Sequence, residues 1–285
     1  MLTDSRLDAV VSAALDEDAP WGDITSTAVL PAAAQAQATL TAREPGVLAG
    51  SEAFSAAMRL TDATITVDFA ARDGDRFDAG DELARVTGPA RSVLTGERVG
   101  LNFVQRMSGI ATLTARFVAA VAGTGARIVD TRKTTPGLRM LERHAVRCGG
   151  GHNHRYSLSD AVLVKDNHLA VLTAGGRDLT EALREVRKRI GHTTHFEVEV
   201  DRIEQIEPVM AAGVDTIMFD NFSVDQLREG VALVAGRALI DASGGVSLDT
   251  VAAIAATGVN VISVGALTHS ARAIDLGLDI RIDAP

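Results

Sequence analysis

The sequence predicts an α/β protein whose larger part is a parallel barrel. After residue 125, six short apolar segments each run directly into a polar cluster, and helical patterns such as residues 179–190 and 248–256 lie between them. Strands that alternate with helices indicate a parallel sheet. Because all six units are polar at their carboxyl ends, a barrel with its ligand site on that rim is favoured. An open doubly wound sheet has the same kind of rim and is the alternative.

The six predicted strands share a simple pattern of three to five apolar or alternating residues before a polar residue or a glycine. A smaller layer precedes them, in which residues 36–43 and 65–69 alternate as half-buried strands do. Residues 94–122 predict one or two helices, and the chain divides near residue 108. Residues 272–285 alternate again and are expected to return to the first layer. The six barrel segments are residues 127–129, 161–164, 196–200, 216–219, 238–240 and 261–264.

Composition excludes several classes of protein. The chain has 285 residues, 46% of them hydrophobic and 23% charged, so it can form a core and does not have the composition of a disordered chain. No apolar run approaches the roughly 20 residues that a membrane span needs. The net charge of −9 argues against general nucleic-acid binding, which requires clustered Lys and Arg. Cys148 is the only cysteine, which predicts a reducing, cytoplasmic location.

Although the chain is acidic, cationic side chains gather at the predicted strand ends. A cleft lined by such groups focuses positive potential on a highly anionic ligand. Any one of them could be an ordinary surface charge, and for Lys133 alone that interpretation is the better one. Their occurrence at successive strand ends favours an anion site instead. The group comprises Arg132, Lys133, His154, Arg155, Lys165, His168 and His269.

Two glycine-containing loops are suited to phosphate. Ser243, Gly244 and Gly245 follow one predicted strand and precede a helix, and the loop from Gly265 to His269 does the same. Glycine lets the backbone approach a ligand closely, and free N–H groups at a helix start favour an anion. Taken alone, Ser-Gly-Gly is more often a tight turn. Two such loops after the last two strands favour a phosphate site.

The carboxylates form a third set. Glu197 and Glu199 alternate within one strand, so both point to the same side, which we expect to be the barrel interior. Buried acids need partners, and Lys133 and Lys165 are candidates for a structural charge network. Asp220, at the next strand end, supports a functional interpretation in which carboxylates hold magnesium or ribose hydroxyls. For Glu197 the structural interpretation is favoured.

The stretch from Cys148 to Arg155 contains His152 and His154 and raises the possibility of a zinc site. Its spacing matches no closed four-ligand pattern. A glycine loop that brings His154 and Arg155 to an anion is the favoured interpretation. A zinc hydrolase that uses His152, His154 and His168 is kept as a rival hypothesis.

Motifs along nearly the whole chain resemble those of the quinolinate phosphoribosyltransferases, also called decarboxylating nicotinate-nucleotide pyrophosphorylases. The stretches DTRKTTPGLR and GGGHNHR are the most specific, and the matches occur in the family's order. The motifs are GDITS (22–26), LTGERVGLN (94–102), DTRKTTPGLR (130–139), AVRCGGGHNHR (145–155), LVKDNH (163–168), EVEVD (197–201), FDN (219–221), ASGG (242–245) and VGALTHS (264–270).

The resemblance implies an N-terminal α/β sandwich domain and an incomplete, seven-stranded α/β barrel. We expect the sandwich over residues 1–107, with residues 272–285 packing on it, and the barrel over residues 108–271. The implied reaction joins quinolinate to phosphoribosyl pyrophosphate with Mg²⁺ and releases nicotinate mononucleotide, pyrophosphate and carbon dioxide, a step of NAD biosynthesis. The implied assembly is a homodimer with shared active sites. Neither nucleic acid nor membrane is an expected partner.

The resemblance also assigns roles to individual residues. Arg98 matches an arginine lent to the neighbouring subunit, and Arg132, His154 and Arg155 match residues around the quinolinate carboxylates. The set around ribose and pyrophosphate comprises Lys133, Lys165, Glu199 and Asp220, of which Glu199 and Asp220 are the expected metal ligands. The set around the 5′-phosphate comprises Ser243, Gly244, Gly245, Gly265 and His269.

One position departs from the family pattern, and three rival functions remain. Asp241 stands where the family usually has a glutamate, so a hydrogen bond of that carboxylate is expected to be lost or bridged by water. A nicotinate phosphoribosyltransferase of the same fold would not release carbon dioxide. A zinc hydrolase would contain metal after purification. A non-catalytic barrel would bind a sugar phosphate without turnover.

Overall fold

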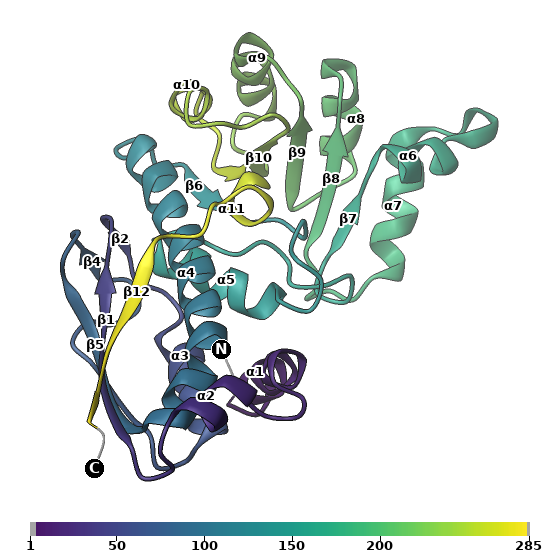
Figure 1. Ribbon diagram of the computed structural model, residues 1–285. Coiled ribbons are helices and arrows are strands. Elements are labelled where there is room, and N and C mark those ends of the chain that lie inside the picture. Colours follow the sequence, from purple (N-terminus) through teal and green to yellow (C-terminus); the bar gives the residue numbers. More distant parts are fainter. Residues whose placement is uncertain (1–3, 284–285) are drawn as a thin grey trace. The chain divides into compact units, whose positions relative to one another are not determined.

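The computed structural model describes residues 4–283, which form two compact units (Figure 1). Within the described residues, unit 1 comprises residues 4–115, 134–150 and 268–283, and unit 2 comprises Arg116–Lys133 and Gly151–Leu267. The chain therefore crosses between the units several times. None of the helices within residues 4–283 combines the length and the apolar character that a membrane span requires.

Unit 1 contains a four-stranded antiparallel sheet in the order β12-β1-β5-β3. In β1, Ala36, Ala38, Leu40 and Ala42 are buried while the residues between them are more exposed, as expected when one face of a sheet covers a core. The C-terminal strand β12 pairs with β1 along its whole length. The strands are β1 (Gln35–Ala42), β3 (Thr66–Phe69), β5 (Glu82–Pro89) and β12 (Leu276–Asp283), with a separate pair β2 (Gly46–Val47) and β4 (Arg76–Phe77).

Helices cover the core of unit 1. Phe54 and Met58 of α3 are fully buried, and the ring of Phe54 meets Phe69 edge to face at a centroid distance of 5.9 Å. Full burial of such a side chain contributes roughly 1.5–3 kcal/mol. The pattern over residues 94–122 forms a single helix, α4. The helices are α1 (Asp4–Asp18), α2 (Ile24–Val29), α3 (Ser51–Thr61), α4 (Ala90–Ala120) and α5 (Arg139–Cys148).

Unit 2 contains a six-stranded parallel sheet in the order β6-β11-β10-β9-β8-β7. All six strands predicted from the sequence are present. Beyond β6, the backbone of His152 makes a parallel bridge with Val129 and adds a seventh, single-residue member. Among residues 4–283 no pairing joins this bridge to β7, so the barrel is incomplete, as predicted. The strands are β6 (Arg127–Val129), β7 (Val162–Val164), β8 (Phe196–Val200), β9 (Thr216–Asp220), β10 (Leu239–Ser243) and β11 (Val261–Ser263).

Helices and turns connect the strands of unit 2. All five residues of β8 are buried, because one face of the sheet meets helices and the other meets the barrel interior. Ser223 caps α9 by accepting the N–H of Gln226, and Asp178 caps α7 through Glu181. The helices are α6 (Asp166–Leu172), η1 (Ala174–Gly176), α7 (Leu179–Arg189), η2 (Ile203–Gln205), α8 (Ile206–Ala211), α9 (Val224–Val234), α10 (Val251–Ala255) and α11 (Ala266–His269).

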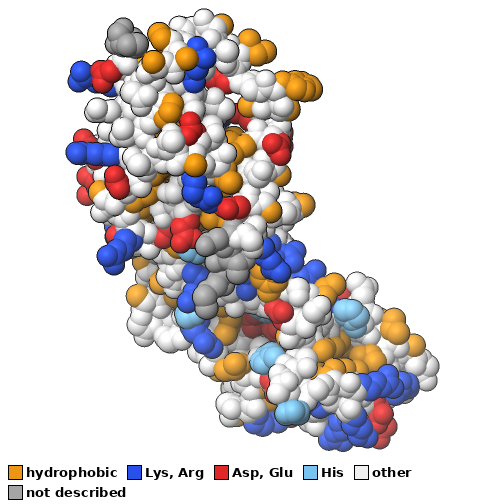
Figure 2. Space-filling model, turned by 90° about the horizontal axis from the view of Figure 1, so that it is seen from below, with side chains coloured by type: hydrophobic (Ala, Val, Ile, Leu, Met, Phe, Trp, Pro, Cys, Tyr) orange, Lys and Arg blue, Asp and Glu red, His pale blue; other side chains and the backbone are white. Residues whose placement is uncertain are grey.

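The charged side chains on the molecular surface are mixed in sign. On the face shown in Figure 2, Lys and Arg side chains are interspersed with Asp and Glu side chains.

Candidate active site

The carboxyl ends of the barrel strands line a pocket of about 390 Å³. Every lining residue belongs to unit 2, and each strand of its sheet contributes to the lining through its last residues or through the loop that follows. The pocket is therefore on the rim where the sequence places the ligand site. Its lining residues are Thr131, Arg132, Lys133, His154, Arg155, Leu163, Lys165, Glu199, Met218, Asp220, Ser243 and Ser263.

Asp130, directly after β6, attaches the histidine-rich loop to the barrel. Its side chain is completely buried and accepts hydrogen bonds from Asn153 Nδ2 at 2.6 Å and from the His154 N–H at 2.8 Å. The bridge between His152 and Val129 holds the same loop by its backbone. Buried charge-assisted hydrogen bonds of this kind are stronger than neutral ones, so Asp130 determines where His154 enters the pocket.

His154 lies over two buried acids. Its Nε2 is 3.1 Å from Glu197 Oε2 and 3.8 Å from Asp241 Oδ2. Burial acts to lower the pKa of His154, but the hydrogen bond to Glu197 and the charges of Glu197 and Asp241 outweigh burial and raise it. The N–H of Arg155 donates to Nδ1 at 2.8 Å, which favours the neutral ring and opposes part of this rise. The Nε2 proton therefore faces Glu197 in either charge state.

The carboxylate of Asp241 finds its hydrogen-bond donors on the neighbouring strand. Its two carboxylate oxygens accept the Ser263 N–H at 3.1 Å and the Ser263 hydroxyl at 2.7 Å. The side chain is only 1% exposed, and burial followed by the charge of Glu197 raises the pKa of Asp241 well above its usual range. Glu197 Oε1 is also buried and has no hydrogen-bond partner among the described residues.

On the other side of the pocket, Glu199 forms an ion pair with Lys165. Glu199 is 9% exposed and Lys165 is about half exposed, so the lysine reaches from the rim into the barrel. Asp220 accepts a hydrogen bond from Asn221 Nδ2 at 2.8 Å. Both carboxylates line the pocket with oxygen atoms at the ends of adjacent strands.

The turns after β9 and β10 pack tightly. The Asn221 N–H donates to the Ser243 carbonyl at 2.9 Å, and Gly244 adopts a φ of +93° against Asn221. A Cβ at Gly244 would lie 2.2 Å from Asn221 Oδ1, so only glycine fits there. This close approach leaves the backbone of the Ser-Gly-Gly turn at the pocket rim.

Positive charge is concentrated beside the histidine. Burial lowers the pKa of Arg155, and the positive charge of Arg132 lowers it further. Arg155 Nη1 donates to the Ala161 carbonyl at 2.9 Å, which fixes the direction of its guanidinium. Two guanidinium groups this close together strongly attract an anion with more than one carboxylate.

Comparisons with known proteins identify the family to which this chain belongs. The model of the quinolinate phosphoribosyl transferase C-terminal domain matches residues 110–279, and that of the N-terminal domain matches residues 23–108. This chain belongs to the quinolinate phosphoribosyl transferase family. The predicted family and enzyme class are therefore confirmed.

Full-length relatives agree with this assignment to the quinolinate phosphoribosyl transferases. A nicotinate-nucleotide pyrophosphorylase (carboxylating) of Mycobacterium leprae is 44% identical over 98% of this chain and 100% of its own length. A quinolinate phosphoribosyltransferase (decarboxylating) of Nicotiana tabacum is 40% identical over 96% of this chain and 82% of its own. The crystal structure of NadC from Streptococcus pyogenes matches with a TM-score of 0.94 at 39% identity, over 100% of this chain and 99% of that one.

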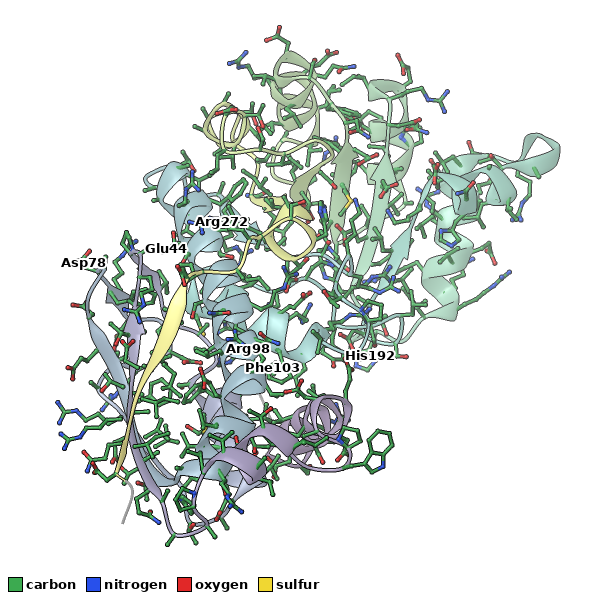
Figure 3. The ribbon with its side chains drawn as sticks, viewed as in Figure 1. Glu44, Asp78, Arg98, Phe103, His192 and Arg272 are labelled. Atoms are coloured by element: carbon green, nitrogen blue, oxygen red, sulfur yellow. The ribbon has the colours of Figure 1, made fainter. Side chains whose placement is uncertain are left out.

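The structure of this quinolinate phosphoribosyl transferase brings most of the predicted site residues together. Eight line the pocket: Arg132, Lys133, His154, Arg155, Lys165, Glu199, Asp220 and Ser243. Gly244 and Gly245 follow Ser243, and Gly265 lies two residues after Ser263. Arg98 and His269 are exposed and belong to unit 1, as Figure 3 shows for Arg98 on α4.

Sequence reasoning missed the buried residues that support this site. No role was predicted for Asp130 or Ser263, and Asp241 was predicted to lose a hydrogen bond or to bridge it by water, whereas both its oxygens accept directly from Ser263. The position of each directly at a strand end is the sequence feature that could have indicated a role in the site. Glu197 was expected to pair with a lysine, whereas its observed partner is His154.

The structure gives no support to a zinc site made of His152, His154 and His168. Within residues 4–283, the groups of closely spaced metal-ligand side chains contain neither His152 nor His168. His168 Nδ1 instead accepts the Lys165 N–H at 2.9 Å.

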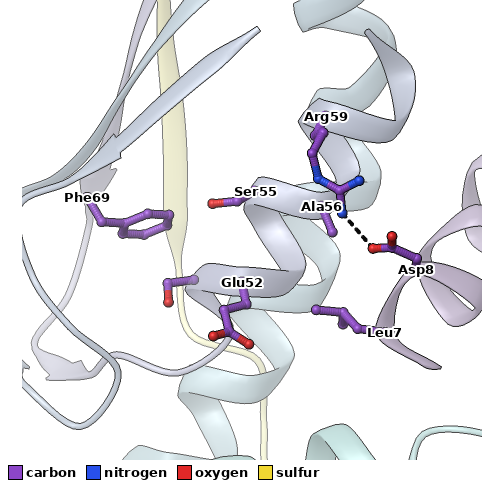
Figure 4. A pocket seen from close by; sticks show the side chains of 8 residues that line it. Leu7, Asp8, Glu52, Ser55, Ala56, Arg59 and Phe69 are labelled. Carbon is purple, nitrogen blue, oxygen red and sulfur yellow. Dashed lines mark hydrogen bonds and ion pairs between the residues drawn. The ribbon is translucent and has the colours of Figure 1, made fainter. Parts of the chain in front are cut away.

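A second hollow, of about 460 Å³, lies in unit 1 beside α3 (Figure 4). Asp8 and Arg59 form an ion pair there at 2.6 Å, and Leu7 and Phe69 supply apolar surface. Among the described residues that line it, the charged side chains are Asp8, Glu52 and Arg59. Two acids and one cation do not favour an anion there, in contrast to the cationic side chains that line the barrel pocket.

Proposed function

We propose that the barrel pocket is where this phosphoribosyltransferase joins quinolinate to phosphoribosyl pyrophosphate, giving nicotinate mononucleotide, pyrophosphate and carbon dioxide for NAD biosynthesis. The proposal rests on one observation. Cationic side chains from separate segments surround the same 390 Å³ cavity as Glu199 and Asp220. That arrangement suits two polyanions held side by side around a ribose ring.

Quinolinate is assigned to the side of Arg132, His154 and Arg155. Arginine forks match carboxylates in a bidentate manner, and the two carboxylates of quinolinate need two such partners. His154 contributes positive charge from a ring whose position is set by Asp130 and Glu197. The pyridine nitrogen is then directed towards the ribose.

Phosphoribosyl pyrophosphate is assigned to the side of Lys133, Lys165, Glu199 and Asp220. Backbone N–H groups near Ser243, Gly244, Gly245 and Gly265 suit the 5′-phosphate, and His269 belongs to the same predicted set. The Ser-Gly-Gly turn supports this role because its backbone lies at the pocket rim.

The donor atoms in the pocket fit Mg²⁺. Glu199 and Asp220 offer carboxylate oxygens beside a cavity that can also hold phosphate oxygens and water, which is the ligand set that Mg²⁺ prefers. When bound, Mg²⁺ would neutralise negative charge on the departing pyrophosphate. Without Mg²⁺, the ammonium group of Lys165 forms the ion pair with the Glu199 carboxylate.

The protein's own contribution is to position the reactants and to stabilise developing charge. The quinolinate nitrogen forms a bond to the anomeric carbon while the bond from that carbon to pyrophosphate breaks. Glu199 and Asp220 stabilise the positive charge on the ribose, and the lysines stabilise the leaving pyrophosphate. Carbon dioxide then leaves from the carbon beside the cationic ring nitrogen, and a proton takes its place. No side chain acts as a covalent nucleophile.

The direct test is to incubate the protein with Mg²⁺, phosphoribosyl pyrophosphate and carboxyl-labelled quinolinate. Nicotinate mononucleotide and labelled carbon dioxide in equal amounts are expected. Turnover of nicotinate without carbon dioxide would support the nicotinate phosphoribosyltransferase instead. Ligand binding without any turnover would support the non-catalytic barrel.

The carboxylate role of Arg132 has its own test. Arg132→Ala should raise the KM for quinolinate far more than the KM for phosphoribosyl pyrophosphate, because a bidentate contact is lost from one substrate only. Equal effects on both substrates would contradict the role. Arg237→Ala, which changes an exposed pair with Glu207, is the control.

We also propose a homodimer in which Arg98 of the partner subunit completes each site. Arg98 is exposed on α4 and is not among the residues that line the pocket of its own chain. Inactive Arg98→Ala and inactive Lys165→Ala proteins should regain activity when mixed, because hybrid dimers contain one intact site. If subunits exchange and no activity returns, the shared site is excluded. The cytoplasmic location also remains a prediction.

A further inference from the structure

A second cluster of metal-ligand side chains lies in unit 1, formed by residues that play no part in the proposed reaction. Asp73 lies just before β4, and His144 and Cys148 lie one turn apart on the same face of α5. One donor atom from each residue lies within 4.8 Å of the other two. The side chain of His144 is 31% exposed and that of Asp73 is 16% exposed, so the cluster is accessible to a small ion.

Both neighbours approach the same atom of the imidazole ring. His144 Nε2 is 2.7 Å from Asp73 Oδ2 and 3.3 Å from Cys148 Sγ. A catalytic Cys-His-Asp relay would use opposite ring nitrogens, because the ring must accept a proton on one side while the acid holds it on the other. The shared nitrogen excludes such a relay. The three donor atoms instead converge on one point.

An ion pair between Asp73 and His144 explains only part of this geometry. The Asp73 oxygens also accept the N–H groups of Gly50 at 2.9 Å and Ser51 at 3.1 Å, which fix the carboxylate at the start of α3. The pair would be complete without a sulfur atom. Cys148 nevertheless brings its thiol to the same nitrogen, so the convergence needs a further explanation.

We propose that Asp73, His144 and Cys148 form a binding site for a thiophilic divalent cation of the Zn²⁺ type. Thiolate sulfur, imidazole nitrogen and carboxylate oxygen are the ligands that zinc takes, and three of them leave a fourth position for water. Mg²⁺ avoids sulfur, so this site is chemically distinct from Glu199 and Asp220.

The observed distances are close to those of a tetrahedral site. Usual zinc bond lengths place nitrogen and oxygen ligands about 3.3 Å apart and nitrogen and sulfur ligands about 3.6 Å apart. The cluster would therefore have to open by roughly 0.3–0.6 Å, which side-chain rotation in partly exposed residues can supply. The incoming ion must also displace a proton, since the hydrogen bond to Asp73 and then that to Cys148 raise the pKa of His144 to about 10.

Co²⁺ provides a specific test, because Cys148 is the only cysteine of the chain. A sulfur-to-cobalt charge-transfer band can then arise from this residue alone. The tag-free protein is stripped with a chelator and titrated with Co²⁺ at about pH 8, where an ion competes better with the proton. We expect this band together with the visible bands of a tetrahedral ion, and displacement of Co²⁺ by Zn²⁺ but not by Mg²⁺.

Substitution of each of the three residues tests whether its side chain binds the ion. Cys148→Ser should abolish the charge-transfer band. His144→Gln and Asp73→Asn should each weaken Co²⁺ binding at least about tenfold, since even the loss of a ligand's outer hydrogen-bond partner costs that much. His192→Gln, at an exposed histidine of unit 2, should bind as the wild type does.

Two outcomes would overturn the proposal. The first is a wild-type protein that shows no charge-transfer band at saturating Co²⁺, a result that depends on no variant. The second is a band of unchanged affinity in folded His144→Gln and Asp73→Asn proteins, which would mean that the thiol binds the ion alone. Circular dichroism confirms the fold of each variant.

Discussion

Replacement of Glu197 by glutamine tests the charge network beneath the pocket. The substitution keeps the size of the side chain and removes its negative charge, 3.1 Å from His154 Nε2. At that distance a unit charge contributes about 5 kcal/mol with an effective dielectric constant of about 20. That figure is an upper bound, because Asp241 remains nearby and the glutamine can still accept a hydrogen bond. We therefore expect the pKa of His154 to fall.

The sign of the pH effect follows from this fall. In the wild type the raised pKa keeps His154 positively charged to higher pH than a free histidine, and in Glu197→Gln that charge is lost at lower pH. The loss of quinolinate affinity on raising the pH should therefore begin earlier in the variant. Imidazole ¹⁵N chemical shifts measure the pKa directly, with His195, which contacts Thr216 instead, as the internal control. An unchanged His154 titration would refute the network.

Three further predictions concern stability, measured by urea unfolding. Asp130→Ala should cost about 3 kcal/mol and lower turnover, because two N–H donors lose their buried charged acceptor. Unchanged stability would contradict the anchoring of the loop. Arg106→Met should cost about 3 kcal/mol, since it leaves the buried Glu142 without the cation 2.8 Å away, whereas Arg228→Met at an exposed pair should change little. Gly109→Ala should cost about 3 kcal/mol or more, because its Cβ would lie 1.9 Å from the Arg272 carbonyl oxygen, while Gly191→Ala, whose nearest neighbour is 3.4 Å away, should be tolerated.

The strands of the barrel could be predicted because each is a short apolar run that ends at a polar residue. That pattern arises from burial on both faces, and β8 shows it directly. The pocket rim could be predicted for the same reason, because parallel strands bring their carboxyl ends together. The ion pair between Lys165 and Glu199 could be predicted as one of several candidate pairs, because both residues lie near the ends of adjacent strands.

What could not be predicted depends on contacts between distant segments. His154 reaches Glu197 only because Asp130 and the Val129 bridge hold its loop against β6. No periodicity within the loop encodes that attachment. The same holds for Cys148, whose neighbour Asp73 comes from a turn far away in the sequence.

The departure at Asp241 shows how a shorter side chain is accommodated. Both oxygens of this buried carboxylate are satisfied by Ser263 on the neighbouring strand. The register of β10 and β11 places Asp241 beside Val261, so the serine backbone and hydroxyl lie within reach of an aspartate. A longer glutamate at this position would have to move its carboxylate past Ser263 towards His154.

The buried acids explain how a protein of net charge −9 can attract two polyanions. Asp130, Glu197 and Asp241 are all at most 4% exposed, so their charge is directed at the loop and at His154 and not at solvent. Arg132 and Arg155 line the same pocket as His154. The buried acids thus hold the histidine-rich loop in place, while Arg132, Lys133, Arg155 and Lys165 provide the cationic groups that attract the anions.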